Sequence, residues 1–190
     1  MKDRILNCIK ESAKVKESIF NSQEIVSNIQ SIVDHSVDVF KRGGKILLCG
    51  NGGSASDAQH IAAELSGRFY KERKPLFAEA LHVNTSFVTA VANDYGYDHI
   101  YSRMVEAAGK KLDILIGIST SGNSKNVVNA ILKAREIGMI TVGFTGESSC
   151  EMDHLCDTMI KIPSINTPRI QEAHILIGHI ICQLIEEELF

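Results

Sequence analysis

The sequence predicts an α/β protein built on a doubly wound, flavodoxin-like, five-stranded parallel sheet with long N-terminal helices. Short apolar runs alternate with segments of helical periodicity, which is typical of parallel sheets covered by helices on both faces. Residues 1–42 contain neither Gly nor Pro and repeat apolar residues at helical spacing. At 190 residues the chain is long enough for one well-packed core, so residues 1–190 are expected to form a single domain.

The N-terminal pattern predicts one or two long helices over residues 1–42, ended by Gly43 and Gly44. Helices of this length exceed what a wound sheet requires, and their apolar faces need a partner. We therefore expect residues 1–42 to be an oligomerisation element and residues 43–190 to be the α/β core.

Five apolar segments in the remaining chain are expected to be strands. They lie at residues 45–49, 78–83, 112–118, 139–145 and 158–162. Helices are expected at residues 54–67, for a short stretch after 85, at 97–108, 123–137 and 169–188, the last entered through Pro168. Ligands of such a sheet bind at the carboxyl ends of its strands, so functional residues are expected in the segments that follow the strands.

The overall composition excludes several classes of function. The net charge of −3 provides no basic surface, so nucleic acid is not expected as a partner. No apolar run approaches the roughly 20 residues of a membrane span, and the N-terminus does not resemble a signal peptide. The five cysteines follow no disulfide spacing, which indicates a reducing, cytoplasmic location. Cys150, His154 and Cys156 have no standard metal-site spacing, so we interpret these thiols as structural.

A glycine-rich turn follows the first expected strand. Gly50, Gly52 and Gly53 allow a sharp turn and a close approach to a ligand. Ser54 and Asp57 fit a capping box, which predicts a helix start there with its positive end facing an anion. The turn matches neither the dinucleotide fingerprint nor the P-loop, and an ordinary turn is the alternative interpretation.

His60 and Glu64 are separated by four residues on the expected helix, so their side chains lie on one face about one turn apart. Such a pair can bind a metal ion or transfer protons. A solvated surface ion pair is the more common reason for this spacing. The position just after the glycine-rich turn favours a functional role.

A second candidate anion site follows the third strand, where residues 119–124 supply four hydroxyl groups and a glycine before a helix. Hydroxyls at a helix N-terminus suit a phosphate monoester. A simple helix cap is the alternative. The loop contains no Lys or Arg, so neutral donors would bind the anion. Asp94, which follows Asn93, is equally compatible with a site carboxylate and a turn residue.

Four segments together resemble, in order and spacing, the phosphoheptose isomerases (sedoheptulose 7-phosphate isomerases) of the sugar isomerase (SIS) superfamily. They are CGNGGSASDAQHIAAEL, VANDYGYD, ISTSGNSKNV and RIQEAHILIGH. The resemblance implies the SIS fold and a cytoplasmic homotetramer. It also implies conversion of sedoheptulose 7-phosphate to D-glycero-D-manno-heptopyranose 7-phosphate. This reaction is the first step toward nucleotide-activated heptoses for lipopolysaccharide or other surface glycans.

The resemblance also implies the roles of individual residues. Glu64 would be the catalytic base and His179 the acid. One zinc ion per subunit would be bound by His60, Glu64, Gln171 and His179. Substrate would contact Asn51, Gly52, Gly53, Glu64, Asn93, Asp94, Ser119, Thr120, Ser121, Ser124 and Gln171.

The chemistry of aldose–ketose isomerisation supports most of these roles. An enediol mechanism needs a base that moves a proton between C1 and C2 and a group that manages charge on the oxygens. A zinc-bound carboxylate is a weaker base, so Glu64 either stays on the metal or changes its coordination during turnover. Gln171 lies about 12 Å of helix rise and roughly 80° of rotation from His179, which makes it the weakest expected ligand. His174 is rotated by roughly 140° from His179 and is expected to serve packing.

Two other functions remain compatible with the resemblance. A non-catalytic SIS protein could bind the replication initiator or sense sugar phosphates, but it would not need Glu64 and His179. An isomerase of a different phosphosugar would need both. The metal loaded in the cell and the anomer released do not follow from the sequence.

Overall fold

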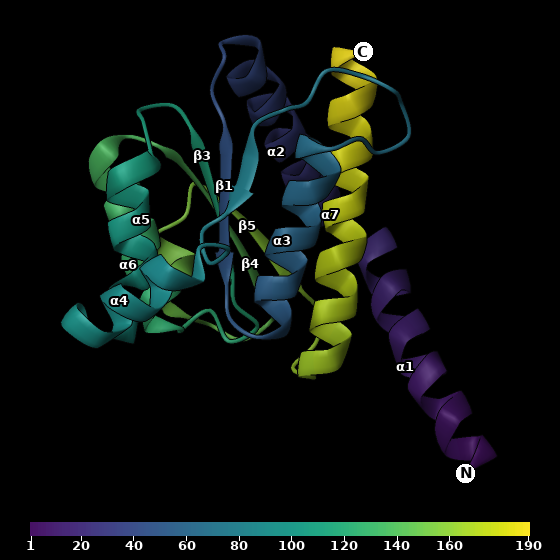
Figure 1. Ribbon diagram of the computed structural model, residues 1–190. Helices are drawn as coiled ribbons and strands as arrows, with labels where there is room; N and C mark the ends of the chain where they lie inside the picture. Colours follow the sequence, from purple (N-terminus) through teal and green to yellow (C-terminus); the bar gives the residue numbers. More distant parts are fainter.

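The computed structural model describes residues 1–190 and contains one parallel sheet between two helical layers (Figure 1). The strands lie in the order β2-β1-β3-β4-β5, and every neighbouring pair is parallel. This confirms the predicted doubly wound, five-stranded sheet. Their bounds are β1 (Ile46–Gly50), β2 (Ala78–Ala80), β3 (Ile114–Ile118), β4 (Ile140–Gly146) and β5 (Thr158–Ile162).

β2 lies on one side of β1, and the later strands lie on the other side. The order in which successive strands are added to the sheet therefore reverses between β1 and β3. Gly50 at the end of β1 pairs with Ile118 at the end of β3. The loops that follow these two strands therefore begin side by side. In a doubly wound sheet this switch point is where ligands bind.

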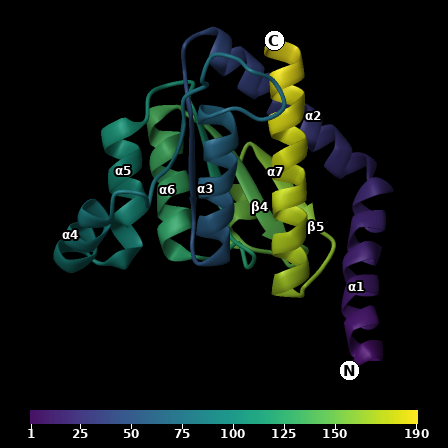
Figure 2. The same ribbon diagram turned by 45° about the vertical axis from the view of Figure 1, so that its right-hand side comes forward.

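Helices cover both faces of the sheet (Figures 1 and 2). One layer contains α2 (Gln23–Lys41), α3 (Gly53–Ser66) and α7 (Thr167–Leu189), whose apolar residues join one large core cluster. The other contains α4 (Thr85–Tyr95), α5 (Ile100–Ala108) and α6 (Lys125–Ile137), and packs through a second cluster. Two short 3₁₀ turns, η1 (Tyr97–His99) and η2 (Glu151–His154), complete the elements.

The N-terminal segment forms two helices, as predicted, but they differ in packing. α2 buries one face against α7 and β5 and so belongs to the core layer. α1 (Lys2–Phe20) projects from the body (Figure 2) and leaves Ile5, Leu6 and Ile9 largely exposed. The part of residues 1–42 left free for association is thus α1. None of the helices combines the length and the apolar character needed to cross a membrane.

The third strand begins two residues later than expected because residues 110–113 form a turn. Leu112 has a positive φ of 71°, a conformation incompatible with an extended strand. The buried Asp113 carboxylate fixes this turn by accepting hydrogen bonds from the backbone N–H groups of Lys45 and Lys110. It also forms an ion pair with the Lys45 ammonium group at 2.6 Å. Local apolar patterning does not reveal such a turn.

Candidate active site

The glycine-rich turn connects the end of β1 to the start of α3. Gly50 is enclosed so tightly that an added Cβ atom would lie 2.7 Å from the Ser54 carbonyl oxygen and 2.9 Å from that of Ile118. Gly52 has a positive φ of 55°, which favours glycine, and is the N-cap of α3. Both positions therefore require glycine, as expected. Because Gly50 packs against Ile118, the backbone of the turn lies close to the start of the serine loop.

The predicted capping box of Ser54 and Asp57 is wrong. α3 begins at Gly53, and no side chain caps it. Asp57 therefore lies in the second turn, too far along the helix to reach the first backbone N–H groups. Its Oδ2 atom is buried without a hydrogen-bond partner. Burial raises the pKa of the Asp57 carboxyl to about 6, while the neighbouring His60 acts in the opposite direction.

The serine loop, residues 119–124, brings its hydroxyl groups together at the end of β3. The Ser119 hydroxyl donates to that of Ser124 at 3.0 Å and lies 3.4 Å from that of Ser121. Ser124 is the N-cap of α6, yet its hydroxyl accepts no bond from the first turn of that helix. The simple cap interpretation is therefore not supported for Ser124. The converging hydroxyls form a neutral donor cluster that suits a phosphate group.

The glycine-rich turn is joined to the start of α6, which directly follows the serine loop, by a reciprocal pair of side-chain amides. The Asn51 amide donates to Asn126 at 2.9 Å, and the Asn126 amide donates back at 2.8 Å. Tyr97 adds a hydroxyl that donates to the Asn51 oxygen at 3.2 Å. The buried Tyr101 hydroxyl donates to the Gly50 carbonyl. This network fixes the glycine-rich turn relative to the serine loop and to the segment after α4.

The remaining expected substrate contacts lie near these loops. Asn93 and Asp94 are exposed in the last turn of α4, and the Asn93 amide donates to Asp94 at 2.8 Å. The following turn is made by Gly96, with a φ of 93°, and not by Asp94. The Tyr97 contact brings this segment next to Asn51. Thr120 is held at the sheet edge, where its carbonyl accepts from the Gly146 N–H at 3.1 Å.

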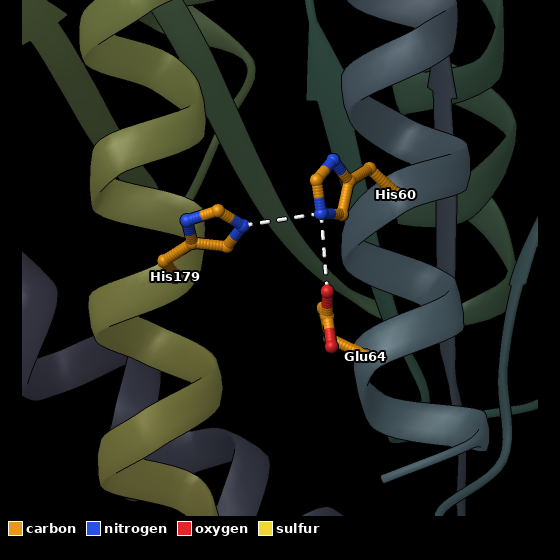
Figure 3. Close-up of side chains that lie close together, drawn as sticks. All are labelled: His60, Glu64 and His179. Atoms are coloured by element: carbon orange, nitrogen blue, oxygen red, sulfur yellow. Dashed lines mark hydrogen bonds and ion pairs between the residues drawn. The ribbon is translucent and has the colours of Figure 1, made fainter. Parts of the chain in front are cut away.

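His60, Glu64 and His179 form a trio between α3 and α7 (Figure 3). His60 Nε2 lies 3.0 Å from Glu64 Oε1 and 3.2 Å from His179 Nε2. All three ligand atoms lie within 4.8 Å of one another. No other group of three His, Cys, Asp or Glu side chains in the structure has this geometry. Cys150, His154 and Cys156 are not among such groups.

The trio has the donor set and the size of a zinc site. One His60 nitrogen faces both partners, but it carries at most one proton and cannot satisfy two acceptors at once. A single cation between the three atoms would satisfy all of them. Zinc–ligand distances of about 2.0–2.1 Å imply ligand atoms roughly 3.3 Å apart in a tetrahedral site, close to the 3.0 and 3.2 Å that separate His60 Nε2 from its two partners. Two imidazoles and a carboxylate are a common zinc set.

The trio lies on the flank of the molecule. The side chains of His60 and Glu64 are 48% and 24% exposed. Phe69 covers part of His179, with ring centroids 5.6 Å apart. Because His60 follows Gly53 by seven residues, the trio lies about 10 Å along α3 from the glycine-rich turn. The candidate anion site at the glycine-rich turn and the candidate metal site at the trio thus lie at two separate places along α3.

Gln171 and His174 take different positions on α7. The Gln171 amide lies against Gly53, where an added Cβ atom would be 2.6 Å from its nitrogen. Gln171 thus contacts the glycine-rich turn at the start of α3. His174 is fully buried and its Nε2 contacts the Thr145 carbonyl at 3.2 Å, which agrees with the predicted packing role. Burial lowers the pKa of His174 to about 4.

Several residues that shape the site were not predicted from the sequence. Asn126 and Tyr97 fix Asn51, and Arg73 and Glu186 form a buried ion pair beside the trio. Asn126 gave no signal in the hydrophobic pattern. Glu186 is weakly indicated by its position, since a carboxylate near a helix C-terminus is disfavoured by the helix dipole and requires a compensating partner.

Comparison with known proteins gives a consistent result over the whole chain. The SIS domain family model matches residues 9–146. The chain is 53% identical to the phosphoheptose isomerase of Clostridium acetobutylicum, with 100% of this chain and 97% of the relative covered. It is 50% identical to that of Aneurinibacillus thermoaerophilus, with 100% and 96% covered.

Solved structures agree. The phosphoheptose isomerase of Neisseria gonorrhoeae superposes with a TM-score of 0.92 at 39% identity over 98% of each chain. That of Francisella tularensis superposes with a TM-score of 0.93 at 35% identity over 97% of each chain. These findings confirm the resemblance based on the four sequence segments. The chain therefore belongs to the phosphoheptose isomerases, a family with the SIS domain fold.

Proposed function

We propose that the protein converts sedoheptulose 7-phosphate to D-glycero-D-manno-heptopyranose 7-phosphate through an enediol intermediate. The observation that carries this proposal is the His60, Glu64 and His179 trio between α7 and the helix that follows the glycine-rich turn, in a chain 53% identical to a phosphoheptose isomerase. Sedoheptulose 7-phosphate has its reacting carbons and its phosphate at opposite ends. A trio about 10 Å along α3 from the loops matches such a substrate.

In this proposal the switch-point loops bind the phosphate and the sugar hydroxyls. Ser119, Ser121 and Ser124 supply hydroxyls that already face one another. The remaining contacts come from around this cluster. They are Asn51, Gly52, Gly53, Asn93, Asp94, Thr120 and Gln171. Because Asn51 is held by Asn126 and Tyr97, its side chain is oriented before substrate arrives.

Glu64 and His179 perform the proton transfers. Glu64 takes the proton from one carbon of the C1–C2 pair and returns it to the other. His179 exchanges a proton with the two oxygens, so that the enediol can form and collapse. Phe69 shields one side of the His179 ring from water. A binding protein has no use for such a pair, so the trio favours the isomerase over the non-catalytic alternative.

His60, Glu64 and His179 are the residues that would hold zinc, with Gln171 as the fourth ligand in the set implied by the family. Bound zinc would polarise the sugar carbonyl and stabilise negative charge on the reacting oxygens. The Gln171 amide lies against Gly53, which suits a contact with the glycine-rich turn or with substrate bound there. Glu64 would have to serve both as a ligand and as a base.

We further propose that the protein acts as a cytoplasmic homotetramer. Half of the His60 side chain is exposed in one chain, whereas general acid–base chemistry benefits from exclusion of water. α1 presents exposed apolar residues that a second copy of this chain would cover. The product would enter the synthesis of nucleotide-activated heptose for lipopolysaccharide or other surface glycans.

The deciding experiment is turnover of sedoheptulose 7-phosphate by protein stripped with a chelator and then reloaded with zinc. Conversion in heavy water should place deuterium on the sugar, because the transferred proton exchanges with solvent at the enediol stage. Fructose 6-phosphate, a shorter ketose phosphate, is the matched control. Saturable binding of the heptose phosphate without conversion, with or without zinc, would favour the non-catalytic alternative.

A further inference from the structure

Residues 67–77 form a strap that connects α3 to β2 and passes around the C-terminal end of α7 (Figure 1). The strap is held by a buried ion pair between Arg73 and Glu186, with a distance of 2.7 Å between Nε and Oε2. Their side chains are only 1% and 2% exposed. Burial of two charges is unfavourable unless hydrogen bonds satisfy them completely. The partners of this pair are therefore informative.

The Glu186 carboxylate is satisfied by the strap. Its Oε1 accepts from the backbone N–H groups of Tyr70 and Lys71 at 2.8 and 2.7 Å. Its Oε2 accepts from the Phe69 N–H at 3.3 Å and from Arg73. Glu186 thus fixes the backbone on both sides of Phe69 and Tyr70, and so fixes the direction of the Phe69 ring.

The Arg73 guanidinium is satisfied by the C-terminal end of α3. Its Nη1 donates to the Leu65 carbonyl at 2.9 Å, with longer contacts to Gly67 and Lys74. Its Nη2 donates to the Glu64 carbonyl at 2.9 Å. A cation at this end also complements the helix dipole, since α3 has no basic residue in its last turn. Arg73 is therefore bonded directly to the backbone of a trio residue.

Both ends of the pair reach the trio. Arg73 bonds to the Glu64 backbone, and Glu186 positions Phe69, whose ring lies 5.6 Å from that of His179. Glu186 also follows His179 by seven residues, which is two turns along the same face of α7. One ion pair thus links the α3 and α7 sides of the trio through the strap.

We propose that Arg73 and Glu186 are positioning residues that hold Glu64 and His179 at the spacing required for the metal and the proton transfers. This inference rests on the proposed function. Capping of α3 accounts for the carbonyl bonds of Arg73, but it does not require an aromatic ring, held by Glu186, beside His179. Groups that orient metal ligands in this way typically change metal affinity or activity by about 10- to 100-fold when they are removed.

The test compares three variants with the wild type by calorimetric titration with zinc and by steady-state kinetics. Arg73→Lys keeps the charge but loses the second arm that reaches the Glu64 carbonyl. Glu186→Gln removes the charge that orders the strap, and Phe69→Leu removes the ring while leaving the ion pair intact. We expect zinc affinity and kcat to fall by about 10- to 100-fold in the first two and by a smaller factor in the third. KM should change less than about twofold, because the serine loop is remote from the strap.

Glu72→Gln is the matched control. Glu72 lies in the same strap and pairs with Arg68 at 3.9 Å, but both side chains are largely exposed. This variant should retain wild-type zinc affinity and kcat. Folding of every variant is checked by circular dichroism and thermal melting.

Wild-type zinc affinity and kcat in folded Arg73→Lys and Glu186→Gln would overturn the proposal. If those variants do not fold, Phe69→Leu decides: unchanged zinc affinity and kcat there would overturn it. A wild-type protein that binds no zinc would also overturn it. A wild-type protein that binds zinc but does not isomerise the heptose phosphate would refute the proposed function alone, and the zinc titrations would still decide this inference.

Discussion

Gly178→Ala should weaken the proposed zinc site more than it weakens the fold. Gly178 precedes His179 on α7 and faces Ile61, which follows His60 on α3. A Cβ atom added at Gly178 would lie 2.5 Å from Cδ1 and 2.7 Å from Cγ1 of Ile61. Carbon atoms in contact are about 3.5–4.0 Å apart, so the helices would have to separate by roughly 1 Å unless Ile61 moved.

The two consequences differ in size. Alanine is favoured over glycine in a helix by about 1 kcal/mol, which offsets part of an overpacking cost of about 1–3 kcal/mol. The net loss of stability should therefore not exceed about 2 kcal/mol. The same separation would lengthen the 3.2 Å distance between His60 Nε2 and His179 Nε2 to roughly 4 Å, beyond what a tetrahedral zinc site tolerates.

Zinc titration calorimetry and urea unfolding measure the two effects separately. We expect zinc affinity to fall at least about tenfold. Adding Ile61→Ala to Gly178→Ala removes both clashing atoms and should restore most of that affinity at some cost in stability. Wild-type zinc affinity in the Gly178→Ala single variant would show that the close helix contact does not set the geometry of the trio.

Four further outcomes follow from the site and the fold. Glu64→Gln should leave the fold intact and lower kcat by at least about a hundredfold, as expected for loss of a general base, and a near-normal rate would remove Glu64 from the mechanism. Ser121→Ala should raise KM more than it lowers kcat, by the equivalent of about 1 kcal/mol, and an unchanged KM would mean that the serine loop does not bind phosphate. Ile5→Asp combined with Ile9→Asp should abolish both the proposed tetramer in light scattering and the activity, whereas an active monomer would show that association is not needed to exclude water from the trio. His174 is held neutral with a pKa of about 4, so the unfolded chain binds its proton first and the contribution of His174 to stability should fall by roughly 3 kcal/mol as the pH drops from about 6.5 to 4; because the raised pKa of Asp57 acts in the opposite direction, the measurement is the difference between wild type and His174→Gln in urea unfolding over this pH range, and a constant difference would contradict the assignment.

Features set by local patterns could be predicted from the sequence. β5 begins and ends at the predicted residues, and α7 starts around Pro168 as expected. His60 and Glu64 meet because four residues make one helical turn. Two strand predictions were wrong at one end. Residues 81–83 lie beyond β2, which ends at Ala80. Leu112 and Asp113 form a turn that is held by side-chain bonds to backbone groups, including that of the distant Lys45.

Features that join distant segments could not be derived from patterns. His179 was placed with His60 only through the family resemblance, since no periodicity relates residues 119 positions apart. Arg73 and Glu186 lie 113 positions apart and belong to no quoted motif. The prediction of a capping box was wrong for a different reason. Gly52 adopts a conformation that lets the helix start before Ser54, so the geometry of the turn, and not the Ser54 and Asp57 pattern, sets the start of α3.

The trio combines the third helix of the chain with the last one, and this has a consequence for the order in which the protein matures. While the ribosome still holds α7, a nascent chain has only two of the three trio residues, so it would not bind zinc early. Zinc would bind after synthesis is complete and would then fasten the C-terminal helix to α3, because binding favours the state in which both helices are docked. Removal of the metal should therefore increase the rate of hydrogen exchange first along α7, at the end of the chain, while the amides of the sheet remain protected.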